Sequence, residues 1–216
     1  MLDALIAGQR DPAALAELAK RRLRSKTPGL TEALTGRFTE HHAFLARVHL
    51  DLIDQRSNAI TELTTRIEVV IQPFRGARDL IITIPGISVL VADMMIAETR
   101  ADMSRFPSAA HLASGAGTCP SSIESAGGIK STKTRYGDPH LNGAPGVAAL
   151  SVARSHDTHL TAKYRPIASR RRPVKATITV EHAMLTATWN MITNGVFYLT
   201  FRTSRAAYPG DYVSCL

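Results

Sequence analysis

The sequence contains little cysteine and few aromatic residues. Of its 216 residues, 6% are aromatic and only two are cysteines, Cys119 and Cys215. With so few aromatic rings, a core must be built from Leu, Ile, Val, Ala and Met, which favours packing of helix on helix over a β-sandwich. The cysteines show no Cys-x-x-Cys or Cys/His spacing, so the pattern excludes a zinc site and a disulfide scaffold.

Long apolar runs and paired carboxylates are also missing. No run approaches the roughly 20 residues that cross a bilayer, and the N-terminus has no signal-peptide apolar region. We therefore expect no membrane association and a cytoplasmic location. No pair of carboxylates stands in a loop or strand suited to Mg²⁺, and the eight histidines are scattered. The residues thus predict no metal site and no cofactor in this chain.

Positive charge is abundant and unevenly spread. The formal net charge is +8, and residues 120–175 contain ten Lys or Arg against three acids. Such clustering favours a polyanionic partner, with DNA or RNA ahead of a membrane surface. The alternative is a basic protein whose charge only keeps it dispersed.

A long helical pattern occupies residues 35–74. Apolar residues from Leu45 to Ile71 recur at alternating steps of three and four, with charged residues on the other faces. The pattern predicts a coiled-coil-like helix that pairs two copies of the chain through residues 38–71. An ordinary long amphipathic helix is the alternative.

The segment Ile84-Pro85-Gly86-Ile87-Ser88 separates two short apolar helical segments over about 76–98. Pro85 can end the first helix and Gly86 can adopt a positive φ. The second helix then begins with unpaired N–H groups, which favour an anion. We interpret it as a helix-hairpin-helix element that contacts DNA phosphates through Gly86, Ile87 and Ser88. A tight turn between two packed helices is the alternative.

A Gly- and Ser-rich stretch without helical periodicity extends from residue 115 to about 139. Its serines are followed by Lys130, Lys133 and Arg135, a combination suited to phosphoryl chemistry, because a hydroxyl can attack phosphorus while cations neutralise the oxygens. An ordinary surface loop is the alternative. The chain then becomes helical again and carries a second cationic group, Arg170, Arg171 and Arg172.

The predicted fold is mainly α. We expect a linker at 1–34, the coiled-coil-like helix at 35–74, and a small helical domain at 75–198 with the hairpin and the serine loop. Residues 199–216 lack periodicity, and we expect them to be disordered.

The order of these motifs resembles the IS110 family of insertion-sequence transposases. After the long helix and I-P-G-I-S come A-E-T-R-A-D-M-S-R-F-P-S-A-A-H-L-A-S-G-A-G-T-C-P at 97–120, E-S-A-G at 124–127 and K-S-T-K-T-R-Y-G at 130–137. The resemblance covers about residues 18–198. It implies DNA recombination at insertion-sequence ends, directed by a bridge RNA, with a helical domain that supplies a nucleophilic serine. That serine maps onto Ser125, and the family's basic stretch maps onto Lys130, Lys133 and Arg135.

The chain also departs from this family. Members carry an N-terminal RuvC-like domain with four acidic ligands for Mg²⁺, and this sequence begins about where that domain would finish. We therefore expect a truncated C-terminal fragment. Pro145 and Pro166 fall in expected helices, Asn142 stands where a longer or basic side chain is usual, and the tail after Tyr198 diverges. Two functions stay open: a transposase fragment with a serine nucleophile, or an inactive remnant that binds nucleic acid and dimerises.

Overall fold

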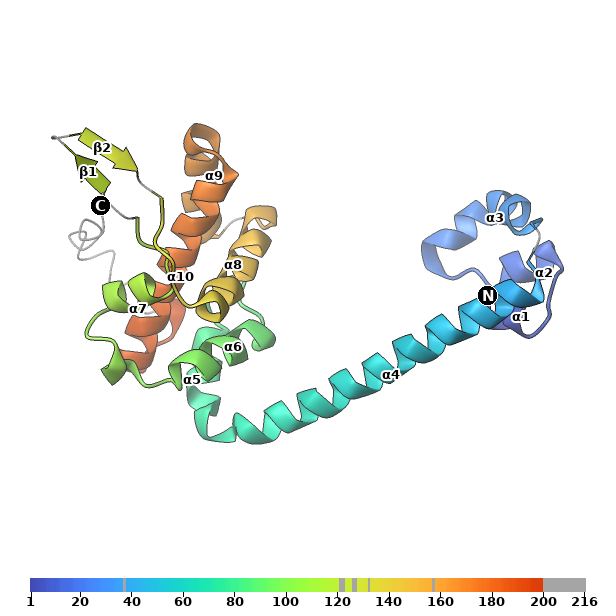
Figure 1. Ribbon diagram of the computed structural model, residues 1–216, viewed down its shortest axis with the longest axis horizontal. Coiled ribbons are helices and arrows are strands. Elements are labelled where there is room, and N and C mark those ends of the chain that lie inside the picture. Colours follow the sequence, from blue (N-terminus) through green and yellow to red (C-terminus); the bar gives the residue numbers. More distant parts are fainter. Residues whose placement is uncertain (37, 121–122, 126–127, 132, 157, 200–216) are drawn as a thin grey trace. The chain divides into compact units, whose positions relative to one another are not determined.

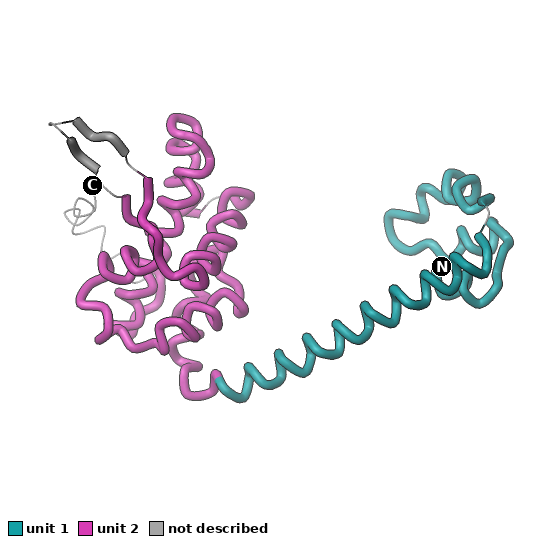
Figure 2. Tube along the Cα trace, in the orientation of Figure 1, with its two compact units in different colours: residues 1–70 teal, residues 71–216 magenta. Residues whose placement is uncertain are grey.

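The computed structural model describes the chain except for residues 37, 121–122, 126–127, 132, 157 and 200–216; within 121–132 it describes backbone only. The chain divides into two compact units, residues 1–70 and 71–216 (Figure 2). The mainly helical fold predicted from the sequence is confirmed. Within the described residues, no helix is both long enough and apolar enough to span a bilayer.

The N-terminal unit contains four α-helices and one 3₁₀ helix (Figure 1). These are α1 (Leu2–Ile6), α2 (Pro12–Glu17), η1 (Arg21–Lys26), α3 (Thr27–Leu34) and α4 (Glu40–Val70). Its buried apolar side chains are few: Leu5, Leu15, Ala16 and Ala19. Because so little apolar surface is buried, this unit has a much smaller core than the C-terminal unit.

Helix α4 is the long helix that the apolar stripe predicted, beginning and ending slightly inside the expected bounds. Its 31 residues extend about 46 Å at 1.5 Å per residue. None of its side chains is buried, and large apolar side chains such as Phe44, Ile60 and Leu63 are more than 60% exposed. The described residues of this chain therefore do not cover the apolar stripe.

The C-terminal unit is a helical bundle built around the last helix. Its elements are η2 (Gln72–Phe74), α5 (Arg75–Ile81), α6 (Val89–Thr99), η3 (Met103–Arg105), α7 (Ala109–Gly115), β1 (Ile123–Ser125), β2 (Gly128–Ser131), α8 (Pro139–Arg154), α9 (His159–Arg171) and α10 (Pro173–Asn194). Helix α10, orange to red in Figure 1, packs against α5, α7, α8 and α9. The core it organises contains Ile81, Met95, Leu112, Val152 and Met184.

Polar caps and glycine fix the helix ends. Ser88 and Thr158 accept hydrogen bonds from backbone N–H groups at the starts of α6 and α9, and Asp138 does so at the start of α8. The bond from the Leu141 N–H, supported by one from His140, lowers the pKa of Asp138. Helix α10 is followed by Gly195, which has φ +64°, the left-handed conformation with which glycine commonly ends a helix.

Both interior prolines lie inside helices. Pro145 is buried in α8, and Pro166 lies in α9. Each removes a backbone donor from its helix, a substitution that costs about 3 kcal/mol in an isolated helix interior. Packing against α10 therefore holds α8 and α9 together in spite of these residues.

The stretch expected to be a loop contains two short antiparallel strands. Residue Ser125 pairs with Gly128, and Ile123 pairs with Ser131. An isolated bridge between Pro120 and Thr134 continues this pairing toward the bundle. The stretch is thus a β-hairpin whose two arms leave the bundle side by side.

Candidate nucleic-acid interface

Helices α5 and α6, called here the helical hairpin, flank the turn that contains Gly86, and a buried ion pair joins them. The Arg78 guanidinium donates from Nε to Asp93 Oδ1 and from Nη2 to Asp93 Oδ2, each at 2.6 Å. The two side chains are 8% and 9% exposed. A bidentate pair fixes both distance and orientation, so it joins the middle of α5 to the middle of α6 in a defined geometry.

Gly86 has the positive φ that the sequence predicted, at +92°. A Cβ at this position would come within 2.7 Å of Val152 Cγ2 and 2.9 Å of Ser151 Oγ on α8. The Ser151 hydroxyl also donates to the Gly86 carbonyl at 3.3 Å. A protein contact therefore explains the requirement for glycine, because the turn lies directly on α8.

The other two residues predicted at this turn lie differently. Ile87 is 7% exposed and its side chain belongs to the core, and its N–H donates to the Ile84 carbonyl at 3.1 Å. Ser88 is exposed, and its hydroxyl accepts from the Val91 N–H at 3.3 Å. The following residues, Val89 and Leu90, are also exposed. The residues that begin α6 thus lie at the surface, and helix geometry leaves the first N–H groups of a helix without intrahelical partners.

The stem of the β-hairpin depends on two glycines. Gly117 has φ +74°, and a Cβ there would come within 2.8 Å of the Arg135 carbonyl and the Gly137 nitrogen. A Cβ on Gly137 would collide with the backbone of Gly117 and Ala116. The Asp138 N–H donates to the Gly115 carbonyl at 2.8 Å and closes the stem. The two arms can approach this closely only because neither glycine carries a side chain.

The strand register places the predicted serine beside the hairpin turn. Ser125 is the last residue of β1 and faces Gly128. The pairing shifts between Ile123 and Glu124, which leaves Lys130 as the extra residue of a bulge in β2. The side chains of Ser125 and Lys130 lie outside the described part of the chain.

Helices α8 and α10 anchor the stem. The Asn142 amide on α8 donates to the Ala116 carbonyl at 2.8 Å. On α10, His182 Nδ1 lies 3.3 Å from the Thr118 hydroxyl, which also donates to the Ala113 carbonyl. Asn142, which departs from the family pattern, therefore has a structural role here.

A buried carboxyl lies beside His182 in the sequence. Glu181 is 3% exposed, and a Cβ on Gly146 of α8 would come within 3.9 Å of its Oε2. Its Oε1 has no hydrogen-bond partner among the described residues. Burial raises the pKa of Glu181 to about 7, because the charged form loses its hydration. Sequence reasoning missed this residue, since it falls on the apolar stripe of α10 without any distinguishing motif.

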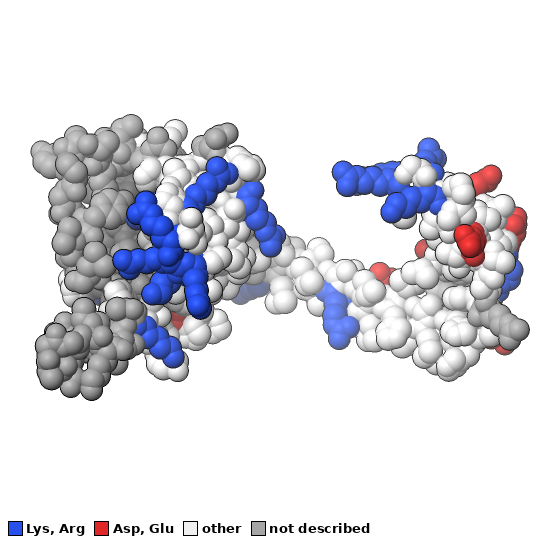
Figure 3. Space-filling view, turned by 90° about the horizontal axis from the view of Figure 1, so that it is seen from above, with Lys and Arg blue, Asp and Glu red and all other residues white. Residues whose placement is uncertain are grey.

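The predicted cations outside the strands are at the surface. Lys133, Arg135, Arg170, Arg171 and Arg172 are all exposed. Figure 3 shows several Lys and Arg side chains of the C-terminal unit gathered on one face. Arg172 has φ +79° and ψ 150°, a conformation that residues other than glycine rarely adopt.

Tyr136, which the sequence reasoning did not single out, is 97% exposed between Arg135 and the stem glycine Gly137. An exposed ring beside cations is the arrangement with which proteins stack unpaired nucleobases. The sequence Thr-Arg-Tyr-Gly at 134–137 could have indicated Tyr136 as a nucleic-acid contact, since it places an aromatic residue beside a cation.

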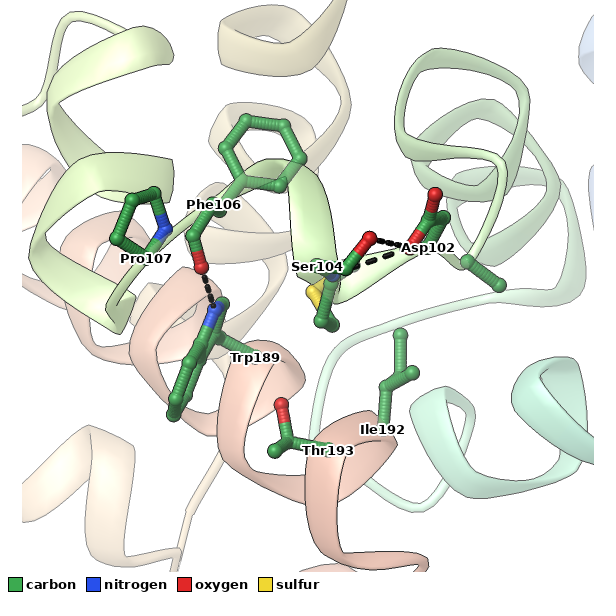
Figure 4. A pocket seen from close by; sticks show the side chains of 9 residues that line it. Asp102, Ser104, Phe106, Pro107, Trp189, Ile192 and Thr193 are labelled. Carbon is green, nitrogen blue, oxygen red and sulfur yellow. Dashed lines mark hydrogen bonds between the residues drawn. The ribbon is translucent and has the colours of Figure 1, made fainter.

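A shallow hollow of about 540 Å³ lies between η3 and the C-terminal end of α10 (Figure 4). Trp189 Nε1 donates to the Phe106 carbonyl at 2.9 Å, and Asp102 accepts from both the backbone and the hydroxyl of Ser104. Its other lining residues include Ile192 and Thr193. These polar groups bond to one another, so the hollow shows no feature of an anion site.

Metal ligands are not grouped in the described part of the chain. No three His, Cys, Asp or Glu side chains there are placed to hold one ion. The described residues therefore supply no ligand set for the Mg²⁺ that the resemblance implies for full-length members.

Residues 78–165 match the family described as Transposase IS116/IS110/IS902 family. This segment is a transposase domain of that family. It begins inside α5, includes the helical hairpin and the whole β-hairpin, and ends inside α9. No curated protein matches the chain. The resemblance stated from the motifs is therefore confirmed for this segment.

Proposed function

We propose that this chain binds DNA and acts in the transposition of an insertion sequence, with Ser125 as the nucleophile. The supporting observation is that the transposase domain at 78–165 contains the helical hairpin and the β-hairpin that carries Ser125.

The proposed chemistry is a transesterification at a DNA phosphodiester. The Ser125 oxygen forms a bond to phosphorus, the bond from phosphorus to one sugar oxygen breaks, and the serine proton ends on that sugar oxygen. The energy of the phosphodiester is conserved in a phosphoserine ester, which a DNA hydroxyl can attack to re-form a strand. The position of Ser125 beside the hairpin turn and opposite Gly128 supports this role, because glycine leaves room for a phosphate.

DNA would be held by backbone and cationic groups together. The exposed N–H groups at the start of α6, around Ser88, suit one phosphate. Lys130, Lys133, Arg135 and the group Arg170–172 would neutralise others, and Tyr136 would stack on an unpaired base. The same groups would also accept the phosphates of a guide RNA.

A second candidate is a chain that binds nucleic acid and dimerises without catalysis. The apolar stripe of α4 favours it, because none of its side chains is buried in the structure. Two copies pairing through residues 38–71 would cover this stripe. Such a chain would interfere with an intact transposase by forming mixed dimers.

Trapping a covalent adduct separates the two candidates. The protein is incubated with nicked or branched DNA bearing a 5′ or 3′ label and Mg²⁺, then denatured and resolved by electrophoresis. The catalytic proposal expects a labelled protein band that Ser125→Ala abolishes and that Ser131→Ala, at the far end of the paired strand, retains. If Ser125→Ala forms as much adduct as the unmodified chain, Ser125 is not the nucleophile.

A further inference from the structure

The segment Lys20–Lys26 carries a charge cluster outside the family-matched domain. Five of its seven residues are cations, namely Lys20, Arg21, Arg22, Arg24 and Lys26, and residues 18–31 contain no acid. All five are exposed. Figure 3 shows a group of Lys and Arg side chains projecting from the N-terminal unit. Like charges held this close repel one another, a cost that a polyanion would relieve.

Local hydrogen bonds give this segment a fixed shape. The Ser25 hydroxyl donates to the Arg22 carbonyl at 2.9 Å, and the Thr27 hydroxyl donates to the Arg24 carbonyl at 2.7 Å. Two carbonyls that would otherwise present negative dipole ends beside the cations are thereby occupied. The Arg24 Nε–H donates to the Ala19 carbonyl at 3.3 Å. This bond holds one guanidinium in position before any ligand binds.

The backbone at the start of the segment is strained. Arg21 has φ +55°, in the left-handed region that costs a residue with a Cβ about 1–2 kcal/mol. Its neighbour Lys20 is extended, with φ −115° and ψ 149°. This change of direction starts the 3₁₀ helix η1 at the cations themselves. Strain of this kind is concentrated at functional sites in proteins.

We propose that Lys20–Lys26 is a second binding site for the phosphate backbone of duplex DNA, independent of the sites on the C-terminal unit. Six residues of 3₁₀ helix extend about 12 Å at ~2 Å per residue. One DNA strand places a phosphate every ~3.4 Å of helix axis, so the segment spans about three phosphates. A membrane surface fits less well, because η1 buries no residue and presents only one large apolar side chain, Leu23.

The inference extends the proposed function to another unit and does not depend on Ser125. Two sites on one chain raise apparent affinity for a long duplex, because the second contact forms within the same complex. For a duplex too short to reach both sites, this gain disappears.

The test measures the salt dependence of binding to a labelled duplex by fluorescence anisotropy. The first variant is Lys20→Gln/Arg21→Gln/Arg22→Gln, which spares Arg24 and its bond to Ala19. The matched control is Arg47→Gln/Arg56→Gln/Arg66→Gln, which removes the same charge from exposed positions along α4. In the first variant, about three phosphate contacts are lost. The slope of the logarithm of the binding constant against the logarithm of the salt concentration then becomes shallower by about 2.7. The control flattens it by less than about 1. Circular dichroism checks that both variants keep their helices.

The slopes of the variants decide whether Lys20–Lys26 is a second DNA-binding site. Equal slopes for the first variant and the unmodified chain, or equal flattening in both variants, overturn the second site. If Arg170→Gln/Arg171→Gln/Arg172→Gln changes nothing while the first variant flattens the slope, this inference stands and the cationic part of the proposed function fails. Tighter binding to vesicles of phosphatidylserine and phosphatidylcholine than to DNA would show that the segment is a membrane contact, and would also overturn the inference.

Discussion

Single glycines decide whether the β-hairpin can leave the bundle as two adjacent arms. We expect Gly137→Ala to destabilise the protein by more than about 2 kcal/mol, because its Cβ would meet the backbone of Gly117, which cannot move like a side chain. The matched control is Gly143→Ala in α8, where nothing lies within 4 Å and alanine should stabilise by about 0.5–1 kcal/mol. Urea denaturation measures both. Equal effects at the two positions would contradict the crowded stem.

A single buried residue, Glu181, also makes the free energy of unfolding depend on pH. Its folded pKa of about 7 is raised above the ordinary value of 4.5, so folding favours the protonated form. The stabilisation of the folded state by protonated Glu181 is fully present below pH 4.5 and is lost as the pH rises through 7. At pH 8 the charged carboxyl therefore costs up to about 3 kcal/mol.

We expect Glu181→Gln to be more stable than the unmodified chain at pH 8 and nearly equal at pH 4. Denaturation curves at both pH values measure this difference. Asp79→Asn, which removes an exposed carboxyl on α5, serves as the matched control for the loss of one carboxyl. A Glu181→Gln variant that loses stability equally at both pH values would mean that the carboxyl is not buried as a neutral acid.

At the scale of elements, the ion pair between α5 and α6 keeps the helical hairpin rigid. Asp93→Asn removes the carboxylate that pairs with the buried Arg78 guanidinium and should cost about 3–5 kcal/mol. The double variant Arg78→Met/Asp93→Leu replaces both charges by apolar groups and should cost less. Chemical denaturation compares the two. A double variant less stable than Asp93→Asn would show that the pair itself, rather than the unpaired charge, dominates.

The long helix α4 gives a second prediction for an element. If the stripe of Leu45, Leu52 and Leu63 pairs two copies, sedimentation over a dilution series should show a dimer. Leu52→Asp should then shift it to monomer, because a charge enters the seam. Ser57→Asp lies on the opposite side of the helical repeat and should leave the dimer intact. A monomer at every concentration would exclude pairing through α4.

The sequence predicted the helices better than the contacts between them. The apolar stripe from Leu45 and the turn at Gly86 depend on local periodicity and on backbone preferences. The ion pair of Arg78 and Asp93 joins residues 15 apart, and the stem joins Gly117 to Gly137. Such pairings between distant residues form only in the folded bundle, so no local sequence pattern predicts them.

In the candidate site, too, local features could be predicted from the sequence and contacts between distant residues could not. The positive φ at Gly86 could be predicted from residue type, but its contact with α8 could not. The contact of Ile87 with DNA stays a prediction. That its side chain belongs to the core could not be predicted from residue type, because burial at a turn depends on which helix packs against it. Strand pairing around Ser125 was missed since serine and glycine have weak β-propensity.

At the scale of the whole molecule, the two compact units should differ in stability. Among the residues that the structure describes, the N-terminal unit buries only Leu5, Leu15, Ala16 and Ala19, whereas the C-terminal unit has an extensive core around α10. Buried apolar area provides most of the folding free energy, so the N-terminal unit should open at a lower free energy. Hydrogen exchange should find the amides of α2 poorly protected and those of α10 protected to the global limit.

Ligand binding makes this prediction more specific. A polyanion that binds only the folded form of Lys20–Lys26 stabilises it by mass action, so duplex DNA should slow exchange in η1 and α2. The Lys20→Gln/Arg21→Gln/Arg22→Gln variant should lose this protection while α10 is unaffected. If α2 exchanges as slowly as α10 without DNA, the N-terminal unit is stable on its own and the difference in core size does not govern its opening. If DNA slows exchange around Ser88 but not in η1, the duplex binds the C-terminal unit alone.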